Sequence, residues 1–324
     1  MGGFVMNKRE RVLAAMNNQY VDRPPVGFWF HFPEEEQLGQ ACVDAHLRYY
    51  NHVDADIAKL MCDGYFDYPN PAAKAVKEAD DWFAMKPLGP ESDFIRGQVE
   101  RAKAVKQGLT SDCLVLYNVF APFSSIRFGT SDELVMRHLK EKPEAILYAL
   151  DVIAQDNALL CEKLITEACI DGVYYCVQGG EKDRFTVEEY QRYITPSDMK
   201  VLAHANRFSS TNVLHCCGWA GIPNHLEVWQ EYPAAAINWA CFVEDMDLTL
   251  GKAFFGGKCV LGGFDNRAGS LMNTGSKEEI QAYARQLVQT HGTTGIMIGA
   301  DCTLPATIDP QRIQWVIDAV NELK

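Results

Sequence analysis

Short apolar runs alternate with longer amphipathic stretches along the 324-residue chain, and the alternation occurs eight times. An apolar run of about 4–8 residues is typical of a buried strand, whereas apolar residues that recur every three or four positions indicate a helix. The predicted strands are Val26–Phe30, Ile57–Cys62, Leu114–Val119, Gly172–Val177, Asn212–Cys216, Ala235–Ala240, Cys259–Gly263 and Gly295–Gly299. The clearest predicted helices are Lys8–Met16, Pro143–Thr166, Val187–Asn206, Lys277–Thr290 and Pro310–Leu323.

Residues that favour the first turn of a helix stand where several of these helices should begin. Ser131, Thr186 and Ser276 each precede acidic residues, and Asp309 precedes Pro310. A serine, threonine or aspartate side chain accepts a hydrogen bond from the first backbone N–H groups of a helix, and proline fits the first helical position. These residues therefore support the predicted helix starts.

Strand-then-helix units in series predict a parallel sheet, and eight units are the number that closes a barrel with a packed interior. We therefore expect a (β/α)8 TIM barrel. The chain contains no linker or low-complexity segment, so residues 1–324 are expected to form a single domain. The charged stretch Asp67–Asp112 is longer than one crossover helix needs, and we interpret it as an insertion over the barrel mouth.

Polar and metal-binding residues follow the predicted strands closely. In barrel enzymes the chemistry takes place at the carboxyl ends of the strands, so these positions should share one rim. They are His31, Asp63, Phe120-Ala121-Pro122, Gln178-Gly179-Gly180, His215 with Cys217-Gly218, Cys241, Asp265-Asn266-Arg267 and Asp301-Cys302.

Composition narrows the classes of partner. The formal charge of −13 and a pI near 5.1 disfavour a nucleic-acid backbone or an anionic membrane surface as a partner. No run reaches the ~20 apolar residues of a membrane span, and the start of the chain lacks the apolar core of a signal peptide. We therefore expect a cytoplasmic protein. Its eleven cysteines should then be reduced, and most of them, such as Cys176 in an apolar string, read as small buried hydrophobic residues.

The most specific local signal is His215-Cys216-Cys217, with Cys302 far downstream at the end of the last predicted strand. Residues two apart in a strand face the same side, so His215 and Cys217 can face one ion while Cys216 turns away. Two thiolates and one imidazole leave a fourth position for substrate or water, as in catalytic zinc sites. The alternative is a core histidine bonded to backbone beside two buried thiols, and the spacing alone does not choose between the two interpretations.

The order of several short segments resembles the uroporphyrinogen decarboxylase superfamily over nearly the whole chain. That resemblance implies a (β/α)8 barrel. The segments that carry it are Arg11–Met16, Asp22–Val26, Asp63, Ala121–Ser125, Gly262–Asp265 and Cys302–Pro305, which leads into 307–321.

Within this superfamily the decarboxylase itself has an arginine-bearing loop after the first strand, which pairs with the carboxylates of its porphyrinogen. Here the matching stretch Phe28–Glu36 has no arginine and three acids, which opposes that substrate. The chain is instead similar to the zinc-dependent methyltransferases, including methylcobamide:coenzyme M methyltransferases and corrinoid-linked O-demethylases. Their His-x-Cys and distant Cys pattern falls on His215, Cys217 and Cys302. Porphyrinogen decarboxylation is kept as the alternative activity.

The resemblance implies that Zn²⁺ is the cofactor and that a methyl group moves between a zinc-bound small molecule and a corrinoid. A separate corrinoid protein should carry the cobalt, because the chain has no cobalamin-binding Asp-x-His-x-x-Gly motif. The aromatic run around His31 favours an aryl ether or another small methylated compound. Tetrahydrofolate, coenzyme M and homocysteine remain open on the other side of the reaction. A non-catalytic member that only binds a corrinoid protein is the alternative from another class.

Further site residues follow from their places on the rim. Asp63 is the candidate catalytic residue, which would receive a proton from the substrate or orient it; otherwise it is a loop aspartate before Gly64. Substrate contacts are expected from Gln178, His31 and Trp239. The candidates for a fourth metal ligand, or for a partner of the other His215 ring nitrogen, are Glu244, Asp245 and Asp265.

Overall fold

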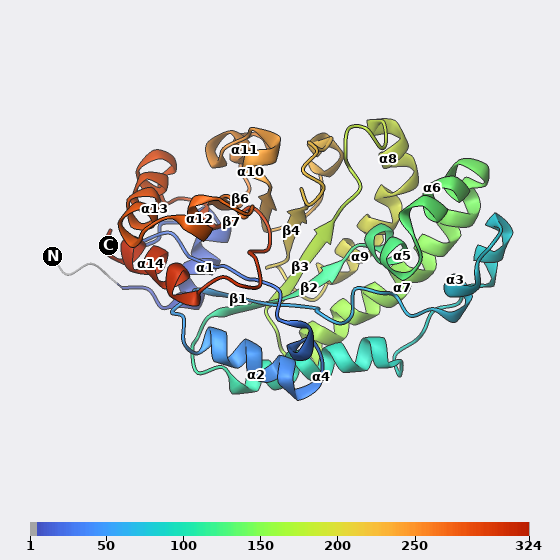
Figure 1. Ribbon diagram of the computed structural model, residues 1–324, viewed down its shortest axis with the longest axis horizontal. Helices are drawn as coiled ribbons and strands as arrows, with labels where there is room; N and C mark the ends of the chain where they lie inside the picture. Colours follow the sequence, from blue (N-terminus) through green and yellow to red (C-terminus); the bar gives the residue numbers. More distant parts are fainter. Residues whose placement is uncertain (1–4, 324) are drawn as a thin grey trace.

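Parallel strands form one curled sheet at the centre of the molecule in the computed structural model, which describes residues 5–323 (Figure 1). Among these residues the sheet has seven strands, and each strand pairs with the next one in the sequence. The strands are β1 (Ile57–Leu60), β2 (Leu114–Phe120), β3 (Gly172–Val177), β4 (Val213–Cys216), β5 (Ala236–Trp239), β6 (Cys259–Phe264) and β7 (Ile296–Ala300).

Helices connect the strands and surround the sheet, so almost every strand residue is buried (Figure 1). Burial on both faces explains the nearly continuous apolar strand sequences. The α-helices are α1 (Lys8–Met16), α2 (Gly39–Tyr50), α3 (Pro71–Ala75), α4 (Asp93–Gly108), α5 (Pro122–Gly129), α6 (Asp132–Glu141), α7 (Pro143–Thr166), α8 (Val187–Tyr193), α9 (Thr195–Ala205), α10 (Cys241–Glu244), α11 (Leu248–Phe254), α12 (Leu271–Thr274), α13 (Lys277–His291) and α14 (Pro310–Asn321). The short 3-10 helices of the described residues are η1 (Glu34–Glu36), η2 (Ala79–Ala84) and η3 (Leu226–Trp229).

The first predicted strand, Val26–Phe30, is not a regular strand, so the expected closed eight-stranded barrel is corrected to a seven-stranded curled sheet of TIM-like topology. The segment makes only isolated parallel bridges, Val26 with Ile298 and Phe30 with Leu304. Its start explains why, because Pro24 and Pro25 have no N–H groups to donate to a ladder.

A buried ion-pair network holds this segment beside β1. The Asp56 carboxylate accepts hydrogen bonds from Arg11 Nη1 (2.6 Å), Arg23 Nη1 (2.6 Å) and the Val26 backbone N–H (2.8 Å). In return, the Asp56 N–H donates to the Val26 carbonyl at 2.8 Å. Side chains thus replace part of the missing strand ladder.

The stretch Asp67–Asp112 does not cover the barrel mouth, and that prediction is wrong. Its second half forms α4, the crossover helix between β1 and β2, which packs against α2 and α7. Its first half lies against α6 and α7, where the buried Trp82 donates to His138 and the Leu88 N–H donates to Asp156. Burial of its apolar side chains on these outer helices accounts for the difference.

The predicted helices are found with small changes at their ends. The side chains of Ser131, Thr186, Ser276 and Asp309 cap their helices as expected. The predicted helix Val187–Asn206 is divided into α8 and α9, because Pro196 cannot continue the hydrogen-bond pattern of the first helix. Among the described residues, none of the helices combines the length and hydrophobicity needed to traverse a bilayer.

Candidate metal centre

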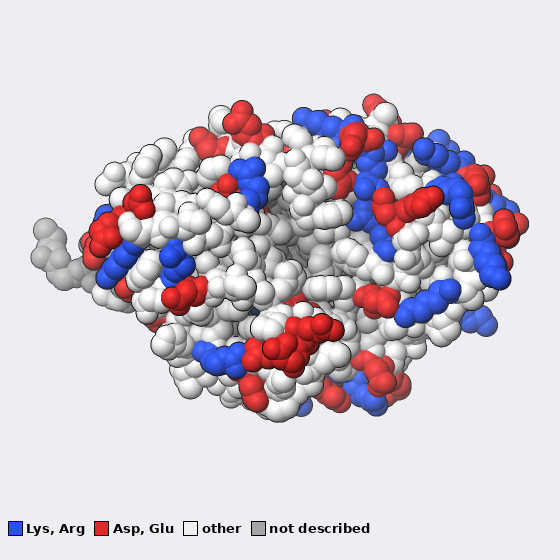
Figure 2. Space-filling view, viewed as in Figure 1, with Lys and Arg blue, Asp and Glu red and all other residues white. Residues whose placement is uncertain are grey.

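A cavity of about 400 Å³ lies at the carboxyl ends of the strands. The face of the molecule drawn in Figure 2 is hollowed near its centre, and mostly uncharged residues border the opening. The cavity is lined by His31, Lys59, Met61, Phe66, Asn118, Phe120, Phe128, Cys176, Gln178, His215, Cys217, Trp219, Asn266, Cys302 and Thr303.

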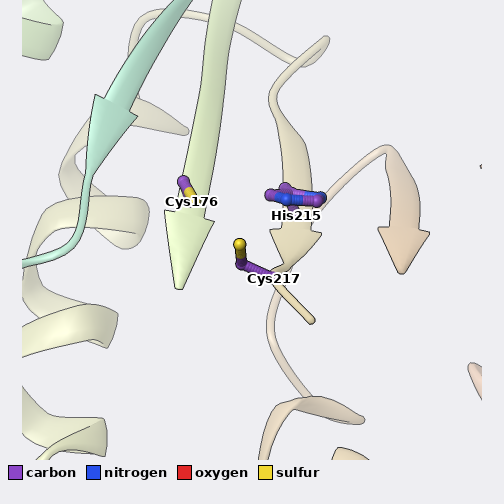
Figure 3. Close-up of side chains that lie close together, drawn as sticks. All are labelled: Cys176, His215 and Cys217. Atoms are coloured by element: carbon purple, nitrogen blue, oxygen red, sulfur yellow. The ribbon is translucent and has the colours of Figure 1, made fainter. Parts of the chain in front are cut away.

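Three thiols and one imidazole converge at this cavity. The ligand atoms of Cys176, His215 and Cys217 lie within 4.8 Å of one another (Figure 3). Cys302 Sγ lies 3.4 Å from His215 Nε2 and 3.8 Å from Cys217 Sγ. The three residues predicted as metal ligands are therefore close together, although His215 lies on β4, Cys217 follows that strand and Cys302 lies after β7.

The register of the sheet explains which cysteines take part. Cys176 on β3 pairs with His215 on β4, so both side chains point to the inside of the sheet. Cys216 pairs with Val177 and belongs to the row that faces the helices, as expected for a bystander. The prediction missed Cys176, because its apolar neighbours favoured an ordinary core cysteine.

Asn238 on β5 fixes the tautomer of His215. Its amide Nδ2 donates to the carbonyls of Leu261 (2.7 Å) and Ala300 (3.1 Å), which leaves Oδ1 as an acceptor. That oxygen lies 2.5 Å from His215 Nδ1 and also accepts the Tyr174 hydroxyl proton at 2.6 Å. Nδ1 of His215 must then carry the proton, so the lone pair of Nε2 points toward Cys302 and is free to bind a metal.

Burial and the neighbouring thiols disfavour ionisation of Cys217 and Cys302 in the absence of a cation. Contact with the Cys176 thiol, together with burial, raises the pKa of Cys217 to about 12. Contact with Cys217 and burial hold the pKa of Cys302 far above its usual range. A divalent metal ion would compensate the negative charge of the thiolates, and soft sulfur donors with one imidazole suit zinc. The residues present therefore fit the expected cofactor.

Asp63 and His31 form a hydrogen-bonded pair beside the cavity. The histidine lines the cavity, whereas the aspartate lies behind it. Asp63 is fully buried and its Oδ1 lies 2.8 Å from His31 Nδ1, while its Oδ2 accepts the Phe32 N–H at 2.9 Å. The His31 side chain is 42% exposed. Asp63 thus holds the Nδ1 side of His31, and its carboxylate is not among the residues that line the cavity.

Two further residues of the lining carry polar groups toward the cluster. Gln178 Nε2 donates to Cys217 Sγ at 3.6 Å, and its Oε1 accepts from Arg127 at 3.3 Å. Lys59 of β1 is buried, and burial lowers the pKa of its ammonium. The sequence offered a signal for Lys59 that was not used, namely a lysine in the middle of an otherwise apolar strand.

Four sequence-predicted residues lie elsewhere. The Trp239 side chain points to the outer helices, where it packs against Phe255 and donates to the Met246 carbonyl, so it is removed from the candidate site. The second ring nitrogen of His215 bonds to Asn238, and not to any of the acidic candidates Glu244, Asp245 and Asp265. Glu244 accepts from Asn224, Asp265 pairs with Arg267, and Asp245 ends α10 in a left-handed conformation.

Comparison with known proteins agrees with this architecture. The uroporphyrinogen decarboxylase (URO-D) family model matches residues 64–323, whereas no curated protein sequence matches the chain. A methyltransferase from Methanosarcina mazei superposes with a TM-score of 0.75 at 14% identity, over 98% of this chain and 99% of that one. A B12-independent methionine synthase from a Shewanella species gives a TM-score of 0.61 at 16% identity, over 93% and 97% of the two chains. These structures share the fold, and the family match shows that the chain belongs to the uroporphyrinogen decarboxylase family.

Proposed function

We propose that this protein is a zinc-dependent methyltransferase, which moves a methyl group between a zinc-held small molecule and a corrinoid carried by a partner protein. The observation that carries the proposal is the cluster of His215, Cys217, Cys302 and Cys176 at one end of an open cavity. The fold shared with a methyltransferase from Methanosarcina mazei supports it.

Zinc would be held by His215 Nε2 and by the thiolates of Cys217 and Cys302, with Cys176 as a fourth donor that substrate can replace. Bound there, zinc would lower the pKa of a substrate thiol or draw electron density from an ether oxygen. Gln178 would stabilise the Cys217 thiolate through the N–H that it already directs at this sulfur.

Methyl transfer also exchanges one proton with the substrate. When a thiol accepts the methyl group, its S–H proton leaves; when a methyl ether is cleaved, the oxygen keeps the electron pair of the broken C–O bond and gains a proton. His31 is placed for both tasks, because Asp63 holds its Nδ1 and leaves Nε2 for the cavity. Asp63 would stabilise the protonated ring.

A corrinoid protein would approach from the open side of the cavity. Trp219 and Phe128 line the cavity and are 59% and 39% exposed. Exposed aromatic groups with few charges are typical of the centre of a protein interface. Docking at this place would bring cobalt in line with a methyl group held at the cluster, and such positioning supplies a large part of the rate.

The lining of the cavity favours methyl transfer over porphyrinogen decarboxylation. Among the described residues, Lys59 is the one lysine or arginine in the lining, and the segment around His31 contributes no arginine. A porphyrinogen with several carboxylates needs several paired cations. The decarboxylase alternative therefore has no support from this cavity.

The test uses zinc-loaded and zinc-depleted protein with methylated and with reduced corrinoid proteins of known methyl-transfer systems. Candidate thiols or methyl ethers are added while the cobalt absorption bands are recorded. The proposal predicts a change between the methylated and reduced spectra that requires zinc and is lost in Cys217→Ser. Full zinc occupancy without a spectral change for any partner would contradict methyl transfer.

A further inference from the structure

Lys59 places an amino group inside the cavity, near the thiols of Cys176 and Cys302. The residue is 3% exposed and its side chain lines the cavity. Among residues 5–323, no carboxylate lies within 4.0 Å of its ammonium. Burial opposes the charge of this ammonium and lowers its pKa, and an anion bound in the cavity would stabilise the charged form.

Aromatic rings hold the ammonium at a defined place. Lys59 Nζ lies 4.2 Å from the ring centroid of Tyr174 and 4.8 Å from that of Trp29. These cation–π contacts stabilise the charge only in part. The Tyr174 ring also stacks on His215, with centroids 5.4 Å apart, so the ammonium and the metal-binding imidazole lie against the same ring.

The rest of the lining suits a flat apolar body. Phe66, Phe120 and Phe128 form a connected group, in which Phe120 lies edge-on to both other rings at centroid distances of 5.4 and 5.1 Å. Trp219 adds a further aromatic side chain. A volume of about 400 Å³ is within the range of small-molecule sites. Aromatic walls of this kind favour a ring over a flexible polar chain.

We infer that the cavity binds a small aromatic anion, with its carboxylate or equivalent acidic group paired to Lys59 and its ring between the phenylalanine side chains. Binding of the anion does not depend on the proposed function. If the proposed function holds, the other end of the ligand would bear a thiol or methyl ether and would point to the metal cluster. The alternative partner of the Lys59 ammonium is the pair of thiolates that Cys176 and Cys302 would provide in a metal cluster.

Binding experiments, which need no corrinoid protein, test whether Lys59 pairs with a bound anion. The probes are 4-methoxybenzoate and benzoate, with their neutral amides 4-methoxybenzamide and benzamide, and affinity is measured by calorimetry on zinc-loaded and zinc-depleted protein. We expect both acids to bind at least about tenfold more tightly than their amides, because a hydrogen bond between charged groups is stronger than one to a neutral group. Lys59→Met should abolish this preference, Lys59→Arg should keep part of it, and the exposed Lys74→Met should leave it unchanged.

Metal analysis of Lys59→Met completes the test, because a methionine of similar shape should preserve packing. The inference predicts unchanged zinc content in this variant. Equal affinity of the wild type for acids and amides would overturn it, as would a preference for acids that persists in Lys59→Met. Loss of zinc from Lys59→Met with the acid preference intact would instead assign the ammonium to the thiolates. Tight acid binding without any methyl transfer would leave the inference standing and remove the proposed function.

Discussion

Asn238 contacts His215 of the candidate metal centre through one oxygen, although it does not line the cavity. Its amide is oriented by the carbonyls of Leu261 and Ala300, and its Oδ1 accepts a hydrogen bond from His215 Nδ1. Asn238→Ala should therefore lower zinc affinity by about 10–100-fold, as is usual when the hydrogen-bond partner of a ligating histidine is removed. Competition with a chelator of known affinity measures the change, with the exposed Asn17→Ala as control. Equal affinity of both variants would show that Asn238 does not position the ring.

His31 is the candidate proton carrier, and Asp63 its positioning residue. Loss of a general acid or base costs about 10²–10⁴-fold in rate, so His31→Ala should reduce the kcat of methyl transfer by at least about 100-fold with little change in KM. Asp63→Asn, which removes the charge behind the ring, should have a smaller effect. Added imidazole should restore part of the activity of His31→Ala, whereas His225→Ala should remain fully active. Wild-type rates in His31→Ala would exclude the role.

At the residue scale the family resemblance predicted three side chains that lie close together, but not their surroundings. His215, Cys217 and Cys302 converge as expected. Cys176 was passed over, because its contribution depends on the pairing of β3 with β4, which sequence spacing does not show. Trp239 was misplaced for a related reason: a shift of one residue along a strand turns a side chain to the other face.

Among the elements, the segment 26–30 is held in place by the pairs that Asp56 makes with Arg11 and Arg23. Breaking a buried ion pair by removing one partner costs about 3–5 kcal/mol, because the remaining charge stays buried. Asp56→Asn should lower the free energy of unfolding by an amount of this order, whereas Asp54→Asn, at a largely exposed position, should change it little. Urea unfolding of both variants gives the comparison. A loss below about 1 kcal/mol for Asp56→Asn would mean that the network does not hold the segment.

Most elements were predictable, because buried parallel strands and capped helices leave clear patterns in the sequence. The exceptions depend on tertiary contacts. Whether Val26–Phe30 completes a ladder depends on which groups accept its hydrogen bonds, and here an Asp56 oxygen takes the place of a strand carbonyl. The position of Asp67–Asp112 depends on the packing of Trp82 and its neighbours against α6 and α7, which no local sequence pattern predicts.

On the scale of the whole molecule, the charge of the cavity bears on the choice between the proposed methyl transfer and porphyrinogen decarboxylation. A single lysine in the lining, among the described residues, cannot pair with several carboxylates. We therefore expect no conversion of uroporphyrinogen by the zinc-loaded protein, as followed by chromatography of the porphyrins after oxidation. A parallel reaction with an authentic decarboxylase verifies the assay. Formation of coproporphyrinogen at rates typical of enzymes would contradict the methyltransferase assignment.

X-ray absorption at the zinc edge, on protein purified without chelator, tests the central claim most directly. The account predicts bound zinc with a sulfur shell at about 2.3 Å and one nitrogen at about 2.0 Å. The sulfur amplitude should fall in Cys217→Ser, Cys302→Ser and Cys176→Ser, and should remain unchanged in Cys216→Ser, whose side chain faces the helices. Protein without zinc, or a spectrum that is the same in all four variants, would contradict a metal centre at this cluster.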